Sequence, residues 1–531
     1  MTASRMMFFL GLVPWMGLMV SSLAAQESAW TELLAEADQG NKSLAEVIAT
    51  RPKDAAITSE SDLAAIGQWI GQLNIDAPAP AANVIANYEV LLSLLVEFEL
   101  SEHLLMDSLR VQRAVERQLE RILRLDSNEL KPLELVAMNS LRYLLMTKSS
   151  KSEGLLLDVA ENKYLQQSNY WSTIVYVIPQ TSSVRRSLQI RIFRGEPMGR
   201  VSVSMVEFEN VQNFEDANYP HFLNRRKGNE LVRQWLLPDL SNEMQTFGAP
   251  KAAAISLAFL QSPDWFDLVR LACEHPDMNV VLEGAWAGAR RADEASIERL
   301  VTLAQDVRYS STAVNYLKEL SLESRIPAGT ANPEFAARAE LAKWLSYPTE
   351  KGRPPDSLEI IDTRQMVWPL EDAPVHVYLI QFSYKDPTGT AADEVDIGFV
   401  GPMTFCHFDM KMLNRPKEDI YAIHVYRELE SYSLIENVDL AQQPGAFDYL
   451  LTTWKKEPLD APEIIAVAKL QPSVEYPRRL IALAKAKIAG EEGYAVLDGP
   501  RSQWYPKKAR VADTPETTLL MIHLGRQLLG F

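Results

Sequence analysis

A short-period repeat between residues 249 and 348 constrains the fold of this chain more than any other feature. The sequence LVRLA at residues 268–272 returns 32 positions later as LVTLA at residues 300–304. The alanine-rich segment around Ala253 returns at the same offset around Ala285. A repeat of about 30–45 residues built from two helices is typical of an α-solenoid, in which each helical pair buries its apolar face against the next. The pattern therefore predicts stacked helical pairs over residues 249–348.

Helix-start signals divide this region into pieces. Ser262-Pro263-Asp264 places a capping hydroxyl, a proline at the first helical position and an acid in the first turn, and Asn332-Pro333-Glu334 repeats that order. Asp277, after His275-Pro276, is positioned to open the next helix. Close approach of neighbouring helices is expected where small residues gather, at Gly284, Ala285, Ala287, Gly288 and Ala289.

The repeat region resembles the HEAT-repeat family in its bacterial short-repeat form. The segments that follow it, Glu340–Leu345, Gly352–Asp356, Trp368-Pro369 and Val400–Phe405, resemble a module of bacterial HEAT-repeat proteins of unassigned function. The resemblance implies a protein-interaction scaffold, and it brings no catalytic residues with it.

The first 25 residues have the pattern of a signal peptide. Arg5 supplies the positive end, Met6 to Val20 the apolar run, and Ser22 to Ala25 a small-residue cleavage site. The run is short for a membrane span and contains Pro14, and the other apolar stretches are shorter than about 18 residues. The sequence therefore predicts an exported protein, periplasmic or secreted after cleavage, with no transmembrane segment in the mature chain.

The charge balance bears on the partners of the chain. Its formal net charge is −17, whereas binding to nucleic-acid phosphates requires clustered cations. No nucleic-acid partner is therefore expected, and the acidity is interpreted as a contribution to solubility.

The predicted fold class is mainly α: an α-solenoid of HEAT-like helical pairs with two small β-containing modules, inserted or appended. After the signal peptide (1–25), the expected order is an N-terminal helical region (26–165), a small β insert with a following helix (166–248), the helical repeats (249–348), a β-rich α/β module (349–455) and a C-terminal helical tail (456–531).

Two stretches show the alternation of a half-buried strand. In the first, Leu188 to Ile192 and Val201 to Met205 predict a hairpin. In the second, Val375 to Tyr384 is apolar on both faces near its start and predicts a central strand, with residues 395–408 as its partner and a helix over 418–432. In the tail, helices are predicted over 477–488 and 516–529.

A basic stripe lies on the helix predicted over the second half of residues 83–125. One interpretation is a surface for a lipid headgroup, an acidic polysaccharide or an acidic partner, hence a peripheral envelope contact. The other is a solvated face whose arginines pair with Glu116 and Glu120. The stripe consists of Arg110, Arg113, Arg117, Arg121 and Arg124.

The leading functional hypothesis is a scaffold that binds a protein partner of unknown identity through its helical surface. Trp265 and Trp286 are candidate exposed anchors, and the alternative for both is packing in the helical core. The rival hypothesis is an exported hydrolase or metal-binding enzyme with a site in the 370–410 β module. Its candidate residues are His376, Cys406, His407 and Asp409.

Three features argue against a metal or redox centre. Adjacent Cys406 and His407 on a strand point to opposite faces and do not easily share one ion. Cys273 and Cys406 fall in different predicted domains, which favours two free thiols over a disulfide. A calcium site in the hairpin loop would lack a recognised ligand spacing; its carboxylates are Asp386, Asp393, Glu394 and Asp396. No cofactor, metal or catalytic residue is assigned.

Overall fold

The computed structural model describes residues 28–531 apart from short gaps, and it separates into two compact units. Unit 1 runs to Leu271 and unit 2 from Ala272 to Phe531, so the boundary falls inside helix α15 (Trp265–Cys273). The signal-peptide segment and Asp409 lie outside the described residues. The gaps are 40–41, 52–56, 58, 75–81, 103–108, 195, 197, 217, 225–226, 238–239, 348, 371–373, 387–388, 409–410, 439–444, 472–478 and 510–515.

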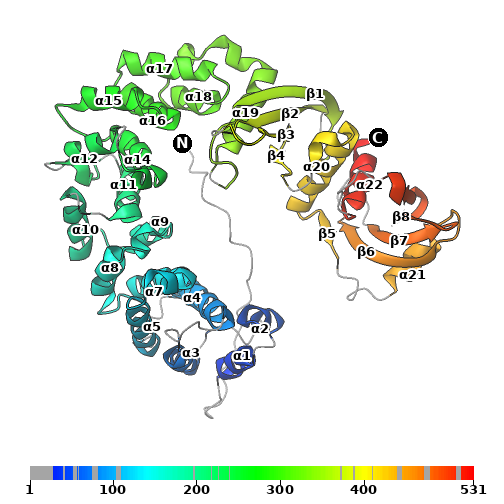
Figure 1. The fold of residues 1–531 in the computed structure, drawn as a ribbon, viewed down its shortest axis with the longest axis horizontal. Coiled ribbons are helices and arrows are strands. Elements are labelled where there is room, and N and C mark those ends of the chain that lie inside the picture. The colour runs from blue at the N-terminus through cyan, green and yellow to red at the C-terminus, as the bar shows by residue number, and fades with distance from the viewer. Residues whose placement is uncertain are drawn as a thin grey trace. The chain divides into compact units, whose positions relative to one another are not determined.

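Unit 1 is helical throughout its described part (Figure 1). Serine and acidic caps begin several of these helices, as at Ser59, whose hydroxyl accepts from the backbone N–H of Asp62 at 3.2 Å. The helices are α1 (Ala29–Asp38), α2 (Leu44–Thr50), α3 (Glu60–Gln72), α4 (Ala82–Glu102), α5 (Leu109–Ile122), α6 (Ser127–Leu130), α7 (Glu134–Met146), α8 (Ser152–Glu161), α9 (Trp171–Val177), α10 (Ser183–Phe193), α11 (Gly199–Glu215), α12 (Gly228–Trp235), α13 (Asn242–Thr246) and α14 (Ala249–Ser256).

The β insert predicted between 166 and 248 is wrong, because that region forms α9, α10 and α11. In α10, Leu188 and Ile192 stand one helical turn apart and are buried, whereas Ile190 between them is exposed. In α11 all residues from Val201 to Val206 are buried. The sequence of a helix that is covered on most sides has no 3.6-residue hydrophobic periodicity. Alternating valines in such a helix then resemble the pattern of a strand.

The helices predicted after residue 249 are confirmed. In unit 2, α16 (Met278–Ala289), α17 (Glu294–Gln305), α18 (Ser310–Glu319) and α19 (Pro333–Leu345) each contact the next in order. Asp277 and Asn332 cap α16 and α19 as predicted. Gly284 of α16 allows close approach, since a Cβ placed on it would lie 2.6 Å from the Cβ of Ala272.

Unit 2 also contains two antiparallel sheets. Sheet A has the order β1-β2-β3-β4, and sheet B the order β5-β6-β7-β8-β9. The predicted central strand is β2, which pairs with β1 and β3. Their bounds are β1 (Ser357–Val367), β2 (Pro374–Tyr384), β3 (Glu394–Val400), β4 (Phe405–Cys406), β5 (Ile435–Asn437), β6 (Asp460–Leu470), β7 (Arg479–Ile488), β8 (Glu491–Leu497) and β9 (Gln503–Pro506).

Three further helices belong to these sheets. The helix predicted over 418–432 is α20 (Lys417–Ser431), and the one predicted over 516–529 is α22 (Thr518–Leu529). The C-terminal helical tail predicted over 456–531 is wrong, because its described residues include strands β6 to β9 and only α22 forms a long helix. The helix predicted over 477–488 is strand β7 from Arg479 onward, which pairs with β6 and β8. The third helix is α21 (Ala446–Thr452).

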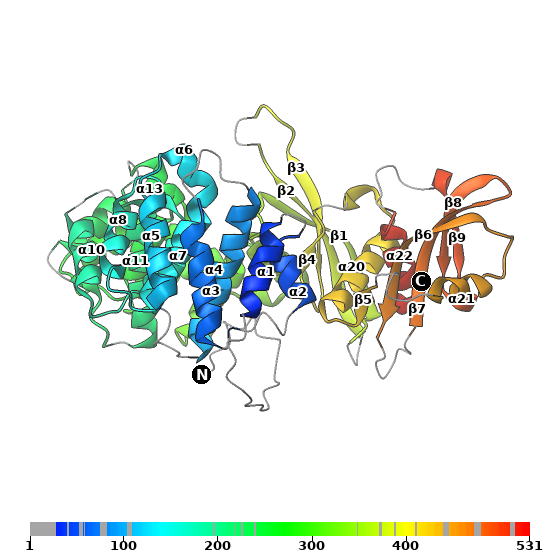
Figure 2. The same ribbon diagram turned by 90° about the horizontal axis from the view of Figure 1, so that it is seen from below.

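Helices and sheets alternate as layers in this part of unit 2 (Figures 1 and 2). One face of sheet A, including Ile380 and Phe382, packs on Leu341 of α19. Its other face packs on α20, and α20 and α22 together fill the space between the two sheets. Helix α21 covers the outer face of sheet B. The central part of sheet A is therefore covered by helices on both faces, which leaves its edges as places where a ligand can approach the backbone.

Candidate functional site

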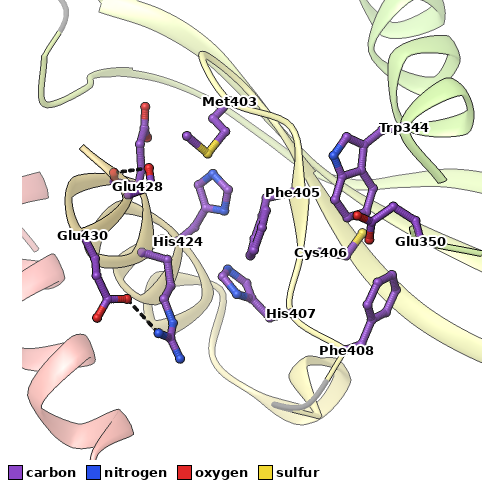
Figure 3. A pocket seen from close by; sticks show the side chains of 12 residues that line it. Trp344, Glu350, Met403, Phe405, Cys406, His407, Phe408, His424, Glu428 and Glu430 are labelled. Carbon is purple, nitrogen blue, oxygen red and sulfur yellow. Dashed lines mark hydrogen bonds and ion pairs between the residues drawn. The ribbon is translucent and has the colours of Figure 1, made fainter. Parts of the chain in front are cut away.

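An open cavity of about 610 Å³ in unit 2 lies beside strand β4 (Figure 3). Its walls come from the end of α19, from the chain around β4 and from the last turns of α20. The lining residues are Trp344, Glu350, Met403, Phe405, Cys406, His407, Phe408, His424, Arg427, Glu428, Glu430 and Ser431.

Side chains around β4 alternate between the two faces of sheet A. Cys406 and Phe408 lie on the α19 side, where the rings of Phe408 and Trp344 stack with centroids 6.2 Å apart. His407 lies on the α20 side, 5.6 Å from the ring of His424. Phe405 reaches rings on both sides, with centroids 5.9 Å from Trp344 and 4.8 Å from His407. The cavity therefore extends around the edge of the sheet, since β4 is the last strand in its order.

His424 is the most deeply buried polar group of the cavity. Its ring stacks on Phe399 at 3.6 Å between centroids. Burial holds the pKa of His424 well below its usual value, and the neighbouring His407 lowers it further. Within the described part of the chain neither ring nitrogen has a hydrogen-bond partner of good geometry, although the Met403 backbone lies close enough to favour protonation slightly. A neutral imidazole with unused polar atoms thus faces the cavity.

The remaining polar residues of the α20 wall are engaged with one another. The Nε1–H of Trp368 donates to the carboxylate of Glu428. Arg427 pairs with Glu430 at 2.7 Å, and Glu430 also accepts from the side-chain amide of Asn437 at 2.6 Å. These contacts fix the end of α20 and leave the rings as the main accessible surface of the cavity.

The structure separates the residues of the hydrolase hypothesis. Cys406 and His407 line the same cavity, but their side chains point to opposite sides of β4 (Figure 3). Burial raises the pKa of the Cys406 thiol, which disfavours a thiolate nucleophile. His376, which the pattern placed on a buried face, is exposed on β2 and stacks beside Tyr378. Asp409 is outside the described residues.

Sequence reasoning missed His424, the residue that the structure places beside His407. A signal was present, because His424 stands in the run Ile420–Val425, whose apolar residues all belong to the buried side of α20. A histidine within such a run is desolvated, and desolvated titratable groups often mark functional sites.

The carboxylates of the β2–β3 loop do not converge on one point. Asp386 accepts from the backbone N–H groups of Thr390 at 2.5 Å and Ala391 at 2.7 Å, Asp396 accepts from that of Ile397, and Glu394 pairs with Lys351. Among the described residues no group of three or more histidine, cysteine, aspartate or glutamate side chains could hold a metal ion.

Both cysteines of unit 2 are free thiols, as predicted. Cys406 is buried, and Cys273 is half-buried at the end of α15. Burial raises the pKa of the Cys273 thiol to about 11, so this group is also protonated near neutral pH.

The two tryptophans predicted as exposed anchors are core residues. Trp265 is 3% exposed and its Nε1–H donates to the carbonyl of Leu257 at 2.7 Å. Trp286 is 2% exposed and its ring lies against that of Tyr316, with centroids 5.6 Å apart. Neither indole is available to anchor a partner on the surface.

Four arginines of the basic stripe lie on α5 in unit 1, as predicted, and Arg124 lies in the turn that follows this helix. Arg110, Arg113, Arg117 and Arg124 are exposed, and Arg121 is half-buried. Glu116 and Glu120 are turned to other partners, because Glu116 accepts from the hydroxyl of Ser149 and Glu120 pairs with Lys151 at 2.6 Å.

None of the described helices is both long and apolar enough to cross a bilayer. Comparison of the chain with family models, with curated proteins and with solved structures gives no match.

Proposed function

We propose that this chain is an exported protein-interaction protein, and that unit 2 holds an extended segment of a partner protein at the edge of sheet A. The observation that supports this proposal most directly is that residues on both faces of sheet A line the cavity around the last strand, β4. In this proposal the partner segment pairs with β4 as an added strand.

Strand addition fits the arrangement of the cavity walls. The side chains of an extended peptide alternate between two faces, while its backbone pairs with the edge of the sheet. One side chain of the partner would contact Trp344 and Phe408 on the α19 side, and the next would enter the space beside His407 and His424. Aromatic surfaces suit an apolar side chain of the partner.

His424 gives the site a polar contact at its deep end. Because burial favours the neutral ring, one nitrogen can accept a hydrogen bond and the other can donate one. A partner that supplies a matching polar atom would remove the cost of leaving these nitrogens unsatisfied. This contact would favour segments with a polar group next to the apolar one.

The rest of the chain serves as the scaffold in this proposal. The consecutive packing of α16, α17, α18 and α19 supports a HEAT-like arrangement of helical pairs that carries sheet A on its last helix. The signal-peptide pattern of residues 1–25 supports export in this proposal.

Site-specific photocrosslinking tests the proposal. A benzoylphenylalanine placed at Phe408, which is exposed in the cavity, should form a covalent adduct with a protein of the native envelope. The same group at Tyr449, exposed on α21 away from the cavity, is the matched control. Mass spectrometry of the adduct should place the crosslink in an extended segment with alternating apolar residues.

Two outcomes contradict the proposal. Identical adducts from positions 408 and 449 would mean that the cavity does not select the partner. The second test compares how the chain without benzoylphenylalanine captures the identified partner before and after Phe408→Ala. We expect a loss of about 1–2 kcal/mol in binding, as for an aromatic contact at an interface. Unchanged capture would show that the ring contributes nothing to binding.

A further inference from the structure

The basic stripe of unit 1 is a second surface that the proposed function does not use. Arg110, Arg113, Arg117 and Arg124 are exposed and, within the described part of the chain, form no ion pair. Arg121 differs from them, because its guanidinium donates to the carbonyl of Leu73 at 3.0 Å and so ties α5 to the end of α3.

The acidic residues next to the stripe do not neutralise it. Glu116 is buried and its carboxylate accepts a hydrogen bond from the hydroxyl of Ser149, so this carboxylate faces the start of α8. The carboxylate of Glu120 forms an ion pair with Lys151 at 2.6 Å, and this pair carries no net charge. Arg110, Arg113 and Arg117 therefore form a positive surface on α5 of a chain whose formal net charge is −17. Arg124, in the turn after α5, instead lines a hollow together with Asp158 and Glu161.

The shape of this surface selects an extended array of anions. From residue 110 to residue 117 the cations follow one side of α5 over about 10 Å, given a rise of 1.5 Å per residue. A helix face is convex, so the guanidinium groups do not converge on a single anion. Each planar guanidinium group can donate two parallel hydrogen bonds to the two non-bridging oxygens of a phosphodiester.

An exposed apolar side chain stands at the start of the stripe. Leu109 is 56% exposed and directly precedes Arg110. A dissolved polyanion offers nothing apolar to such a side chain, whereas the boundary between headgroups and acyl chains does.

We propose that α5 makes a peripheral contact with an anionic phospholipid surface, with Arg110, Arg113 and Arg117 on lipid phosphates and Leu109 at the headgroup boundary. This contact is separate from the cavity of unit 2 and does not depend on the proposed function. Because the rest of the chain is acidic and is repelled by such a surface, attachment requires this face and weakens as salt screens the charges.

Vesicle co-sedimentation of the chain without residues 1–25 tests the proposal. Vesicles of phosphatidylcholine with about one third phosphatidylglycerol should bind the protein at low salt, and pure phosphatidylcholine should not. The triple variant Arg110→Gln, Arg113→Gln, Arg117→Gln should bind about a hundredfold more weakly, from about fivefold for each cation at the surface. Leu109→Ser alone should also weaken binding to these vesicles, although it leaves the net charge of the chain unchanged.

A matched triple variant separates the stripe from net charge. Arg186, Arg194 and Arg233 are exposed elsewhere in unit 1, and their replacement by Gln changes the net charge by the same amount. This variant should keep wild-type binding. The proposal is overturned if the wild-type chain does not bind the anionic vesicles, if both triple variants lose binding equally, or if the chain binds a dissolved acidic polysaccharide but no vesicle.

Discussion

His221 uses both ring nitrogens as a neutral imidazole. The backbone N–H of Leu223 donates to Nδ1 at 3.1 Å, and Nε2 lies 3.1 Å from Oδ1 of Asn210. The two contacts together require the tautomer with its proton on Nε2. Protonation of Nδ1 would break the Leu223 contact in a buried site, and burial lowers the pKa of His221 to about 4.

This histidine predicts a loss of stability in acid. In the unfolded chain the group titrates near its usual pKa of 6.5, so the unfolded state binds the proton first as pH falls. The stabilisation is therefore complete above that value and is lost as pH falls towards about 4. By linkage, the free energy of unfolding of unit 1 in the wild-type chain should fall by about 2 kcal/mol relative to that in His221→Gln between about pH 7 and pH 5. Urea unfolding at both pH values measures this difference, and a constant difference would contradict the expectation.

Arg185 is a buried cation with a defined set of partners. Its Nη2 donates to the carbonyls of Val175 at 2.6 Å and Ile178 at 2.8 Å, while Nη1 lies 3.7 Å from Glu209. The guanidinium carbon also stands 4.3 Å from the centre of the Phe208 ring. This one side chain therefore joins α9, α10 and α11.

Removal of that guanidinium should destabilise unit 1 strongly. Arg185→Ala leaves the carboxylate of Glu209 buried without its cation and leaves two carbonyls short of a donor, so we expect a loss of about 3–5 kcal/mol in the free energy of unfolding. Arg194→Ala, at the residue directly after α10 and largely exposed, should cost less than about 1 kcal/mol. Equal losses in chemical denaturation would show that burial does not decide the effect.

At this scale, the exposure of individual side chains was hard to predict from the sequence. Trp286 and His376 show the limit. Helical or strand spacing assigns a side chain to a face, but the exposure of that face depends on what covers it. Trp286 is covered by Tyr316 from another helix, whereas β2 is left uncovered at its start, so that His376 meets solvent.

Among the elements, the contact between α20 and α22 depends on a missing side chain. A Cβ added to Gly525 would lie 2.0 Å from the carbonyl oxygen of Ala422, so the two backbones approach more closely than any other residue at position 525 would permit. These helices fill the space between the two sheets, and their separation would disturb both layers.

Gly525→Ala should therefore lower the free energy of unfolding, by about 3 kcal/mol, as expected for overpacking against backbone. Gly154, in α8, is the matched control, because a Cβ there meets nothing within 4 Å. Gly154→Ala should instead stabilise the protein by about 0.5–1 kcal/mol, since alanine loses less chain entropy in a helix. Thermal denaturation distinguishes the two variants by the sign of the change in melting temperature. A change of the same sign in both variants would contradict the argument that α20 and α22 approach closely at Gly525.

Elements were predictable where one face alone is buried. The stripe on α5 follows the expected period. Strand β2, buried on both faces from Val377 to Ile380, was predicted from its apolar residues on both faces instead. The period failed in α11, which is buried nearly all round, and in β7, whose residues Ile481 to Ala484 are all buried between neighbouring strands and helices. The alanines of β7 favour a helix locally, and the ladder with β6 and β8 overrides that preference.

For the whole molecule, the candidate site could not be read from spacing because distant segments build it. Trp344, Phe408 and His424 come from α19, from the end of β4 and from α20, and only the layering of sheet A between helices brings them to one cavity. Cys406 and His407 were found because they are adjacent, but their opposed directions give them different neighbours.

The division into two units predicts how the molecule unfolds. Each unit has its own buried core, with the Arg185 network in unit 1 and the layers around α20 and α22 in unit 2. A chain with separate cores is not expected to unfold in one two-state step. Calorimetry should resolve two transitions: Arg185→Ala should lower only the one that belongs to unit 1, and Gly525→Ala only the other. If either substitution shifts a single common transition, the two cores unfold as one cooperative structure.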